Sequence, residues 1–237
     1  MKRCFGWVVM AGILLATFTP VLAADKKTSA SKPVDPAYAE IRDDPALPRV
    51  LLIGDSISIG YTLPVRHLLK GKANIHRPPT NCGDTARGLK SMATWLGDKK
   101  WDVIHFNWGL HDLKYVDERG TMVAIDKGKQ NLSPEQYAQN LRKLVEEMKK
   151  TGAKLVWATT TPVPDGTSGR RKGDEIKYNK MAEKVMSENG IAVDDLNALV
   201  EKNPRSQLPK NVHFSEEGYK ILAESVTRSI EHAMKKQ

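Results

Sequence analysis

Ser56 is the residue whose type and setting best fit nucleophilic chemistry. Ser56 stands in the segment GDSIS, directly after the apolar run 50–53, where a buried strand would end in a turn. A serine hydroxyl attacks an acyl carbon only when a base takes its proton, and histidine is the common base. Ser56 is therefore a candidate nucleophile at the carboxyl edge of a sheet, although serine is also an ordinary turn residue.

The signatures of several other enzyme classes are missing from the sequence. There is no GxGxxG or GxxxxGKS/T motif after the first expected strand, which argues against dinucleotide and nucleoside triphosphate binding. There is no GxSxG elbow, which argues against an α/β-hydrolase. The His and Cys residues lack the spacing of a metal site, and HExxH does not occur. We therefore expect no metal and no cofactor.

The elements that must position these residues follow an alternating pattern of strands and helices. Short apolar runs predict five strands, at residues 50–53, 73–76, 103–106, 155–159 and 191–193. The clearest helix begins after Ser133, which forms a capping box with Gln136, and it is expected to end at Gly152. A last helix is expected over residues 215–234. This alternation predicts an α/β fold with a central five-stranded parallel sheet, which binds ligands beyond the carboxyl ends of its strands.

The N-terminal residues are predicted to lie outside the folded domain. Residues 1–23 combine a basic start, an uncharged apolar stretch and small residues at the end, which is the layout of a secretory signal peptide. A retained membrane anchor fits less well, because the apolar run is short. Residues 24–48 predict a flexible arm, and residues 49–237 the folded domain. We expect a protein that is periplasmic or secreted, with no stable membrane insertion after cleavage.

The charge balance is basic and points to acidic partners. Cleavage would remove two of the 37 Lys and Arg residues and none of the 28 Asp and Glu residues, which lowers the formal net charge from +9 to +7. The charge alone does not choose between an acidic glycan, a nucleic acid and an anionic lipid. Because no nucleic-acid-binding motif occurs, we expect no nucleic-acid binding. Cys82 would be the one cysteine left, which excludes an internal disulfide.

Four short segments resemble, in order, the blocks of the SGNH (GDSL-type) hydrolase family. They are GDSIS (first block, 54–58), NCGDT (second block, 81–85), NWGLHD (third block, 107–112) and NVHFSEEGY (fourth block, 211–219). The resemblance covers the chain from Arg49 onward, and the four blocks together are much more specific than any one of them. It implies a flavodoxin-like three-layer α/β/α fold and hydrolysis of esters on carbohydrates or lipids, without metal or cofactor.

The resemblance implies a role for residues in each block. Ser56 would be the nucleophile and His213 its base. The oxyanion hole would consist of the backbone N–H groups of Ser56 and Gly83 and a side-chain donor from the third block. Family members carry Asn at that last position, whereas this sequence has His111, which can present one N–H or serve a structural purpose. Asn107 is a lesser candidate for the missing amide.

The fourth block also departs from the family pattern. Most members have an Asp three residues before the histidine, and Lys210 stands there in this sequence. Asn211 could fix the imidazole tautomer, but it would stabilise an imidazolium less than a carboxylate does. A carboxylate from the end of the fifth strand, such as Asp195, is the alternative. We favour a Ser–His dyad supported by Asn211.

Two long segments, residues 114–131 and 162–179, are expected to shape the pocket as lids or substrate contacts. Arg170 and Arg171 lie on the second segment, where an arginine fork would suit the carboxylate of a uronate. A solvated charge run is the more frequent explanation of such a cluster.

These observations predict an exported serine esterase that removes small acyl groups, acetyl first among them, from an acylated carbohydrate. An acyltransferase, lipase or thioesterase on the same scaffold is the first alternative, because the acyl-enzyme step is shared. A glycan-binding protein that has lost catalysis is the second, prompted by the departures at His111 and Lys210. The presence of Ser56, Gly83 and His213 argues against this second alternative. The sequence leaves the oligomeric state open.

Overall fold

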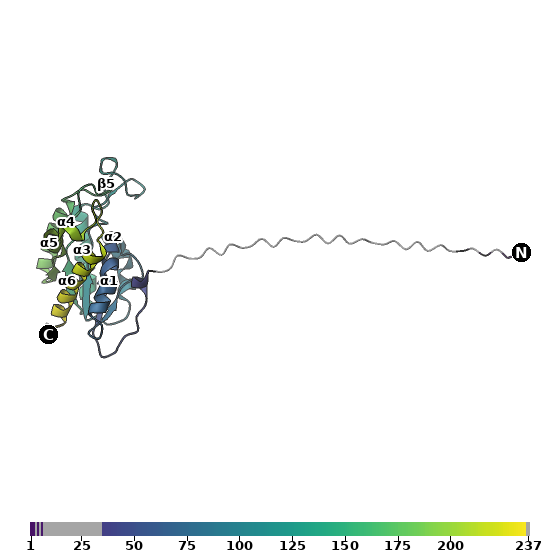
Figure 1. The fold of residues 1–237 in the computed structure, drawn as a ribbon, viewed down its shortest axis with the longest axis horizontal. Coiled ribbons are helices and arrows are strands. Elements are labelled where there is room, and N and C mark those ends of the chain that lie inside the picture. Colours follow the sequence, from purple (N-terminus) through teal and green to yellow (C-terminus); the bar gives the residue numbers. More distant parts are fainter. Residues whose placement is uncertain (3, 5, 7–34, 236–237) are drawn as a thin grey trace. The chain divides into compact units, whose positions relative to one another are not determined.

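The computed structural model of this protein describes residues 1, 2, 4, 6 and 35–235. Apart from four residues, the predicted signal peptide therefore lies outside the described residues, as does the first part of the predicted arm. The described residues from 35 onward belong to one structural unit (Figure 1). Within the described part of the chain, no helix is both long enough and apolar enough to cross a membrane.

A five-stranded parallel sheet forms the centre of the domain, as the sequence predicts. Its strands are β1 (Arg49–Ile53), β2 (Asn74–His76), β3 (Val103–Phe106), β6 (Lys154–Ala158) and β7 (Ala192–Asp194), in the order β2-β1-β3-β6-β7. The central strands are mainly apolar and buried on both faces, as is typical of parallel sheets, and His105 of β3 is a buried polar exception. The strand order switches direction between β1 and β3, so the crevice beyond their carboxyl ends is the expected ligand site.

Helices cover both faces of the sheet (Figure 1). On one face α1 (Ser56–Leu68) packs against α6 (Glu216–Lys235), which also contacts β3, β6 and β7. On the other face α2 (Thr85–Leu96), α3 (Pro134–Lys149) and α4 (Asp174–Glu188) pack side by side, and the short α5 (Leu196–Lys202) follows β7. The three layers are those of the α/β/α arrangement that the resemblance implies.

The N-terminus of α3 is marked by a local sequence signal, a capping box, whereas its C-terminus does not coincide with the predicted Gly152. Ser133 Oγ accepts the backbone N–H of Gln136 at 3.3 Å, and the Gln136 side chain accepts the N–H of Ser133 at 2.9 Å, which completes the predicted capping box. The helix already ends at Lys149. Gly152 lies in the turn that follows, where its φ of 75° suits glycine.

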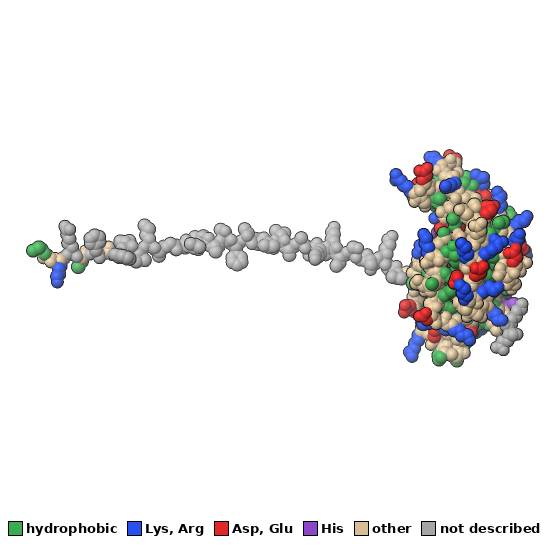
Figure 2. All heavy atoms as spheres, turned by 180° about the vertical axis from the view of Figure 1, so that it is seen from behind, with side chains coloured by type: hydrophobic (Ala, Val, Ile, Leu, Met, Phe, Trp, Pro, Cys, Tyr) green, Lys and Arg blue, Asp and Glu red, His purple; other side chains and the backbone are tan. Residues whose placement is uncertain are grey.

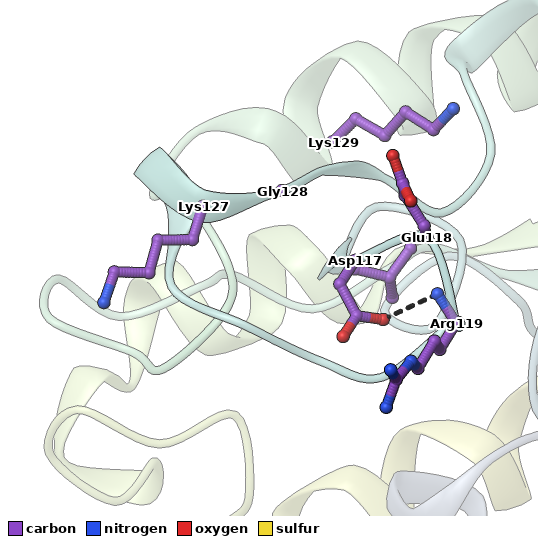
Figure 3. A pocket seen from close by; sticks show the side chains of 7 residues that line it. Asp117, Glu118, Arg119, Lys127, Gly128 and Lys129 are labelled. Atoms are coloured by element: carbon purple, nitrogen blue, oxygen red, sulfur yellow. Dashed lines mark hydrogen bonds between the residues drawn. The ribbon is translucent and has the colours of Figure 1, made fainter.

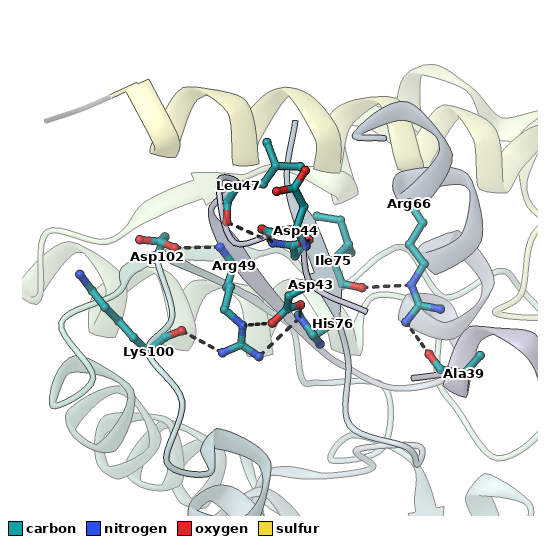
Figure 4. A network of polar contacts seen from close by, with 11 residues as sticks. Ala39, Asp43, Asp44, Leu47, Arg49, Arg66, Ile75, His76, Lys100 and Asp102 are labelled. Carbon is teal, nitrogen blue, oxygen red and sulfur yellow. Dashed lines mark hydrogen bonds and ion pairs between the residues drawn. The ribbon is translucent and has the colours of Figure 1, made fainter. Parts of the chain in front are cut away.

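Residues 35–48, the described part of the predicted flexible arm, make polar contacts with the domain (Figure 4). Asp43 forms an ion pair of 2.8 Å with Arg49, and its other carboxylate oxygen lies 2.6 Å from the Nε2 of His76. The buried carboxamide of Asn74 makes all three of its hydrogen bonds to the backbone of this segment, at 2.9 to 3.1 Å. The segment is polar in composition, and polar contacts connect it to the domain.

The first long segment, residues 114–131, contains a small hairpin in which β4 (Tyr115–Val116) pairs antiparallel with β5 (Lys129–Gln130). An open hollow of about 620 Å³ beside it is lined by charged side chains (Figure 3), namely Asp117, Glu118, Arg119, Lys127 and Lys129. The Tyr115 N–H donates to the carbonyl of Gly169 at 2.7 Å, so the hairpin is joined to the second long segment. That second segment is shorter than predicted, because α4 begins at Asp174.

Candidate active site

Ser56 is the first residue of α1, just beyond the carboxyl end of β1. The carboxylate of Asp55 caps this helix by accepting the N–H of Ile57 at 2.9 Å. Gly54 is required in the turn, because a Cβ there would lie 2.6 Å from the Cβ of Ser58. The turn therefore places the Ser56 hydroxyl and N–H at a helix N-terminus, where the dipole favours developing negative charge.

His213 brings its imidazole to Ser56 from the loop before α6. Its Nε2 atom lies 2.9 Å from the Ser56 Oγ, although the two residues are 157 positions apart. Its Nδ1 atom lies 2.8 Å from the Oδ1 of Asn211, which also accepts the backbone N–H of His213 at 3.1 Å. Because an amide oxygen can only accept, Nδ1 carries the proton and Nε2 presents its lone pair to the Ser56 hydroxyl. The pair is arranged for proton transfer from Ser56 to His213.

The partner of His213 is neutral, because no carboxylate in the described part of the chain hydrogen-bonds to this imidazole. Asp195, the predicted alternative, instead caps α5 and accepts the hydroxyl of Thr159 at 3.0 Å. This corrects its candidacy as the orienting residue. Lys210, at the family's acid position, has a positive φ of 55° and lays its stem against Gly166.

Gly83 lies beside the first block, but its N–H already has a partner. The second-block loop is pinned to the end of β1 by a hydrogen bond of 3.2 Å from the Cys82 N–H to the Gly54 carbonyl. The Gly83 N–H, predicted to be an oxyanion donor, donates instead to the Oδ1 of Asn81 at 2.9 Å. An oxyanion would have to displace this amide oxygen. Burial raises the pKa of the Cys82 thiol to about 11, so it is no rival nucleophile.

His111 follows the sharp turn of the third block. Gly109 has a φ of 148°, and a Cβ there would collide with the side chain of Thr160, so only glycine fits. Burial lowers the pKa of His111; the carboxylate of Asp55 opposes this effect and the ammonium of Lys114 adds to it. The imidazole is therefore neutral at neutral pH and can present one N–H. Among the described residues, no hydrogen bond engages this ring.

The three other predicted site residues have partners within the protein. Asn107 is buried and donates to the last carbonyl of β6 at 2.8 Å, which ties two strand ends together and corrects its candidacy as an oxyanion donor or substrate contact. The Nε–H of Arg170 donates to the carbonyl of Leu110 at 2.9 Å. Arg171 is exposed, and its guanidinium lies 5.4 Å from the ring centre of Tyr115.

Several buried polar residues near the site make contacts that no sequence signal indicates. Arg77 is 8% exposed and donates to the hydroxyls of Ser58 at 3.1 Å and Thr62 at 2.9 Å, which anchors the start of α1. Asp112 accepts the N–H of Thr85 at 2.9 Å, and burial raises the pKa of this carboxyl to about 7. These partners are between 15 and 27 positions apart, so no local pattern indicates them. No group of side chains in the described residues could hold a metal ion.

Comparisons with known proteins agree with the four blocks and with the fold. The model of a family described as GDSL-like Lipase/Acylhydrolase matches residues 52–221, from β1 into α6. This chain belongs to that family. It is an SGNH-type ester hydrolase, as the family and its fold indicate. None of the curated proteins matches this hydrolase by sequence.

Solved structures with the fold of this SGNH hydrolase have low sequence identity to it. A lipase/acylhydrolase from Enterococcus faecalis has a TM-score of 0.65 and 20% identity, with 80% of this chain and 98% of that chain covered. An acetyl xylan esterase, AlAXEase, has a TM-score of 0.61 and 16% identity, with 77% and 99% covered. A GDSL-like lipase from Bacteroides thetaiotaomicron has a TM-score of 0.59 and 17% identity, with 78% and 88% covered. The similarity extends over the whole SGNH fold.

Proposed function

We propose that this hydrolase is an exported serine esterase that removes small acyl groups, acetyl first among them, from a carbohydrate through an acyl-enzyme on Ser56. The observation that carries the proposal is the contact of 2.9 Å between the Ser56 Oγ and the His213 Nε2, with the imidazole proton held on Nδ1 by Asn211. A hydroxyl that faces a neutral imidazole lone pair can lose its proton as it attacks a carbonyl carbon.

The reaction consists of two acyl transfers. In the first, His213 Nε2 takes the Ser56 proton while Oγ attacks the ester carbonyl; the tetrahedral intermediate then collapses, and the imidazolium gives its proton to the departing sugar oxygen. Water attacks the acyl-enzyme with the same proton movements, which releases the carboxylic acid and restores Ser56. Asn211 keeps the ring oriented but carries no charge to offset the imidazolium, so we expect slow turnover.

The negative charge that develops on the carbonyl oxygen needs hydrogen-bond donors. We assign this role to the N–H groups of Ser56 and Gly83 and to the imidazole N–H of His111. The Gly83 N–H becomes available only when the Asn81 side chain moves away, because this N–H donates a hydrogen bond of 2.9 Å to the Asn81 Oδ1. A protonated His111 would place a cation beside the positive N-terminus of α1, which costs free energy. The neutral imidazole avoids this cost.

A carbohydrate substrate is favoured by the polar rim of the site. The loops after β3 and β6 carry charged residues rather than a long apolar lid, and Arg171 is exposed on the second of them, where it could meet the carboxylate of an acidic sugar. Lys and Arg are interspersed with Asp and Glu on the face drawn in Figure 2, so attraction of a polyanion rests on the basic net charge rather than on one patch there. One structure of similar fold is named an acetyl xylan esterase. The layout of residues 1–23 supports export.

An acyltransferase, a lipase or a thioesterase would use the same acyl-enzyme and differ only in acceptor or acyl chain. A protein that binds glycans without catalysis is less compatible with this site. A protein that had lost catalysis would have no chemical reason to keep these groups aligned. Here the His213 Nε2 lies 2.9 Å from the Ser56 hydroxyl, and its Nδ1 lies 2.8 Å from the amide oxygen of Asn211.

The test combines a fluorophosphonate probe with aryl esters and acetylated glycans. Intact-protein mass should show one adduct on the wild type and none on Ser56→Ala. Aryl acetate should be cleaved faster than aryl octanoate, and acetylated xylan should release acetate. Equal labelling of the two proteins would refute the nucleophile, whereas a preference for octanoate would refute the small acyl group. Transfer of acetyl to an added sugar in excess of acetate release would show a transferase.

A further inference from the structure

The turn of the third block is braced at every carbonyl from Trp108 to Asp112. The Trp108 carbonyl accepts two side-chain hydroxyls, at 2.9 and 3.0 Å, and the Gly109 carbonyl accepts two backbone N–H groups, both at 2.9 Å. The His111 carbonyl accepts a side-chain amide at 3.1 Å, and the Asp112 carbonyl accepts a backbone N–H at 3.0 Å. All of these donors are neutral.

The remaining carbonyl of this turn, that of Leu110, accepts a charged donor. The Nε–H of Arg170 reaches it at 2.9 Å from the loop after β6. The same guanidinium contacts the sulfur of Met122 through Nη1 at 3.7 Å, so it connects the third block, the hairpin segment and the β6 loop. Charge-assisted hydrogen bonds are roughly twice as strong as neutral ones, which makes this the strongest single brace on the turn.

The cation is held there without an ion pair. No salt bridge involves Arg170 among the described residues, and burial lowers the pKa of its guanidinium, an effect that the more distant carboxylate of Asp55 opposes. Even a partly buried cation without a carboxylate partner loses some hydration, and a neutral side chain could satisfy one carbonyl at lower cost. This argues for a purpose beyond stability.

We propose that Arg170 is a positioning residue: by holding the Leu110 carbonyl it fixes the next residue, His111, in the orientation in which its imidazole N–H can meet the oxyanion. The proposal rests on the proposed function, in which His111 is an oxyanion donor. It differs from a substrate contact, because the guanidinium acts through the Leu110–His111 peptide rather than on the ester.

The charge of Arg170 supports the same role. Four charged groups act on the half-buried His111 imidazole: Asp55 and Asp84 raise its pKa, whereas Lys114 and Arg170 lower it. Arg170 therefore helps to keep the ring neutral as well as oriented. A neutral imidazole donates a single N–H in one direction. It also does not attract a carboxylate side chain into the oxyanion hole.

The kinetic test is a double-mutant cycle with a neutral aryl acetate, which has no carboxylate for an arginine to bind. Arg170→Met should lower kcat about tenfold and change KM less than twofold, because the loss falls on the transition state. In the His111→Ala background, Arg170→Met should change kcat less than twofold, since there is no imidazole left to position. Lys172→Met is the matched control, since it removes the same charge from the same loop, and it should leave kcat unchanged.

Additive losses in the cycle, or a loss confined to KM, would overturn the proposal. If Arg170→Met does not fold, Arg170→Lys keeps the charge and the stem but not the planar fork. It should lower kcat several-fold, and again only when His111 is present. Equal kcat for Arg170→Lys and the wild type would mean that charge alone suffices, which also contradicts positioning through the Leu110 carbonyl.

A second readout does not depend on activity. Titration of the His111 ring by NMR should shift to higher pH in Arg170→Met and remain unchanged in Lys172→Met. Should the wild type neither cleave aryl acetate nor react with fluorophosphonate, the proposed function fails, and this titration still decides whether Arg170 acts on His111. An unchanged His111 titration in Arg170→Met would refute that action.

Discussion

The substitution Asn211→Asp converts the neutral partner of His213 into a carboxylate with almost no change in shape. The Asn211 Oδ1 already lies 2.8 Å from the imidazole Nδ1 and accepts the His213 backbone N–H at 3.1 Å, so an aspartate oxygen can take the same place. The new carboxylate would face the imidazolium that forms when Ser56 loses its proton, and the wild type has no counter-charge at this position.

The size of the gain follows from the distance and the exposure. Two unit charges about 4 Å apart interact by about 1 kcal/mol in bulk water and about 4 kcal/mol near a protein surface. Asn211 is exposed and His213 is half-buried, so the lower half of that range applies, about 1–2 kcal/mol. Since about 1.4 kcal/mol is a factor of ten in rate, kcat should rise about tenfold. The acid limb of the pH–rate profile should move up by about one pH unit, because the carboxylate favours the protonated imidazole.

The assay is aryl-acetate hydrolysis from pH 4 to 9 with wild type, Asn211→Asp and Lys210→Asp. Lys210→Asp is the control. The side chain at position 210 points toward Gly166, so the new carboxylate would not hydrogen-bond to the Nδ1 of His213. An unchanged kcat and acid limb in Asn211→Asp would refute the inference that the missing counter-charge limits turnover. Equal effects in both variants would show that general electrostatics, rather than the partner of His213, is responsible.

Three further predictions concern other parts of the domain. His111→Ala should lower kcat by about 10²–10³ with little change in KM, and His111→Asn should retain more activity; equal loss in both would assign His111 a structural role. The raised pKa of Asp112, about 7, means that the folded state holds this proton more tightly than the unfolded chain, whose value is near 3.8. The stabilisation is therefore complete below pH 4 and is lost as the pH rises to 7, by at most about 4 kcal/mol, and Asp112→Asn should flatten this slope in urea unfolding at pH 4, 5.5 and 7. Lys210→Asn should raise the free energy of unfolding by about 0.5–1 kcal/mol, because asparagine tolerates a positive φ better than lysine; a lower midpoint in urea would contradict this.

The elements and the Ser–His pair could be predicted because their signals are local. An apolar run followed by GDSIS marks the end of β1, and the third expected strand matches β3 to the residue. Parallel strands meet at one edge, so a serine after β1 and a histidine before α6 were expected to approach each other. The spacing of Asn211 and His213 also allowed their contact to be anticipated.

The contacts that tune the site could not be predicted, because they join residues far apart in the sequence. The bond from Arg170 to Leu110 spans 60 positions, and no composition or period indicates it. The sequence also does not indicate that the side chain of Asn81 accepts the N–H of Gly83. The contacts of residues 35–48 with Asn74 are another example, because they span about 30 positions in a segment whose composition is typical of a flexible linker.

The separation of 157 positions between nucleophile and base has a consequence for the life of the chain before it is folded. Synthesis delivers Ser56 first and His213 much later, just before α6, which packs against the helix that begins at Ser56. A nascent chain that has not yet placed α6 therefore contains a serine without a base. Hydrolytic activity is thus withheld until the whole domain has closed, so the esters of the cell that makes the protein are not exposed to an incomplete enzyme.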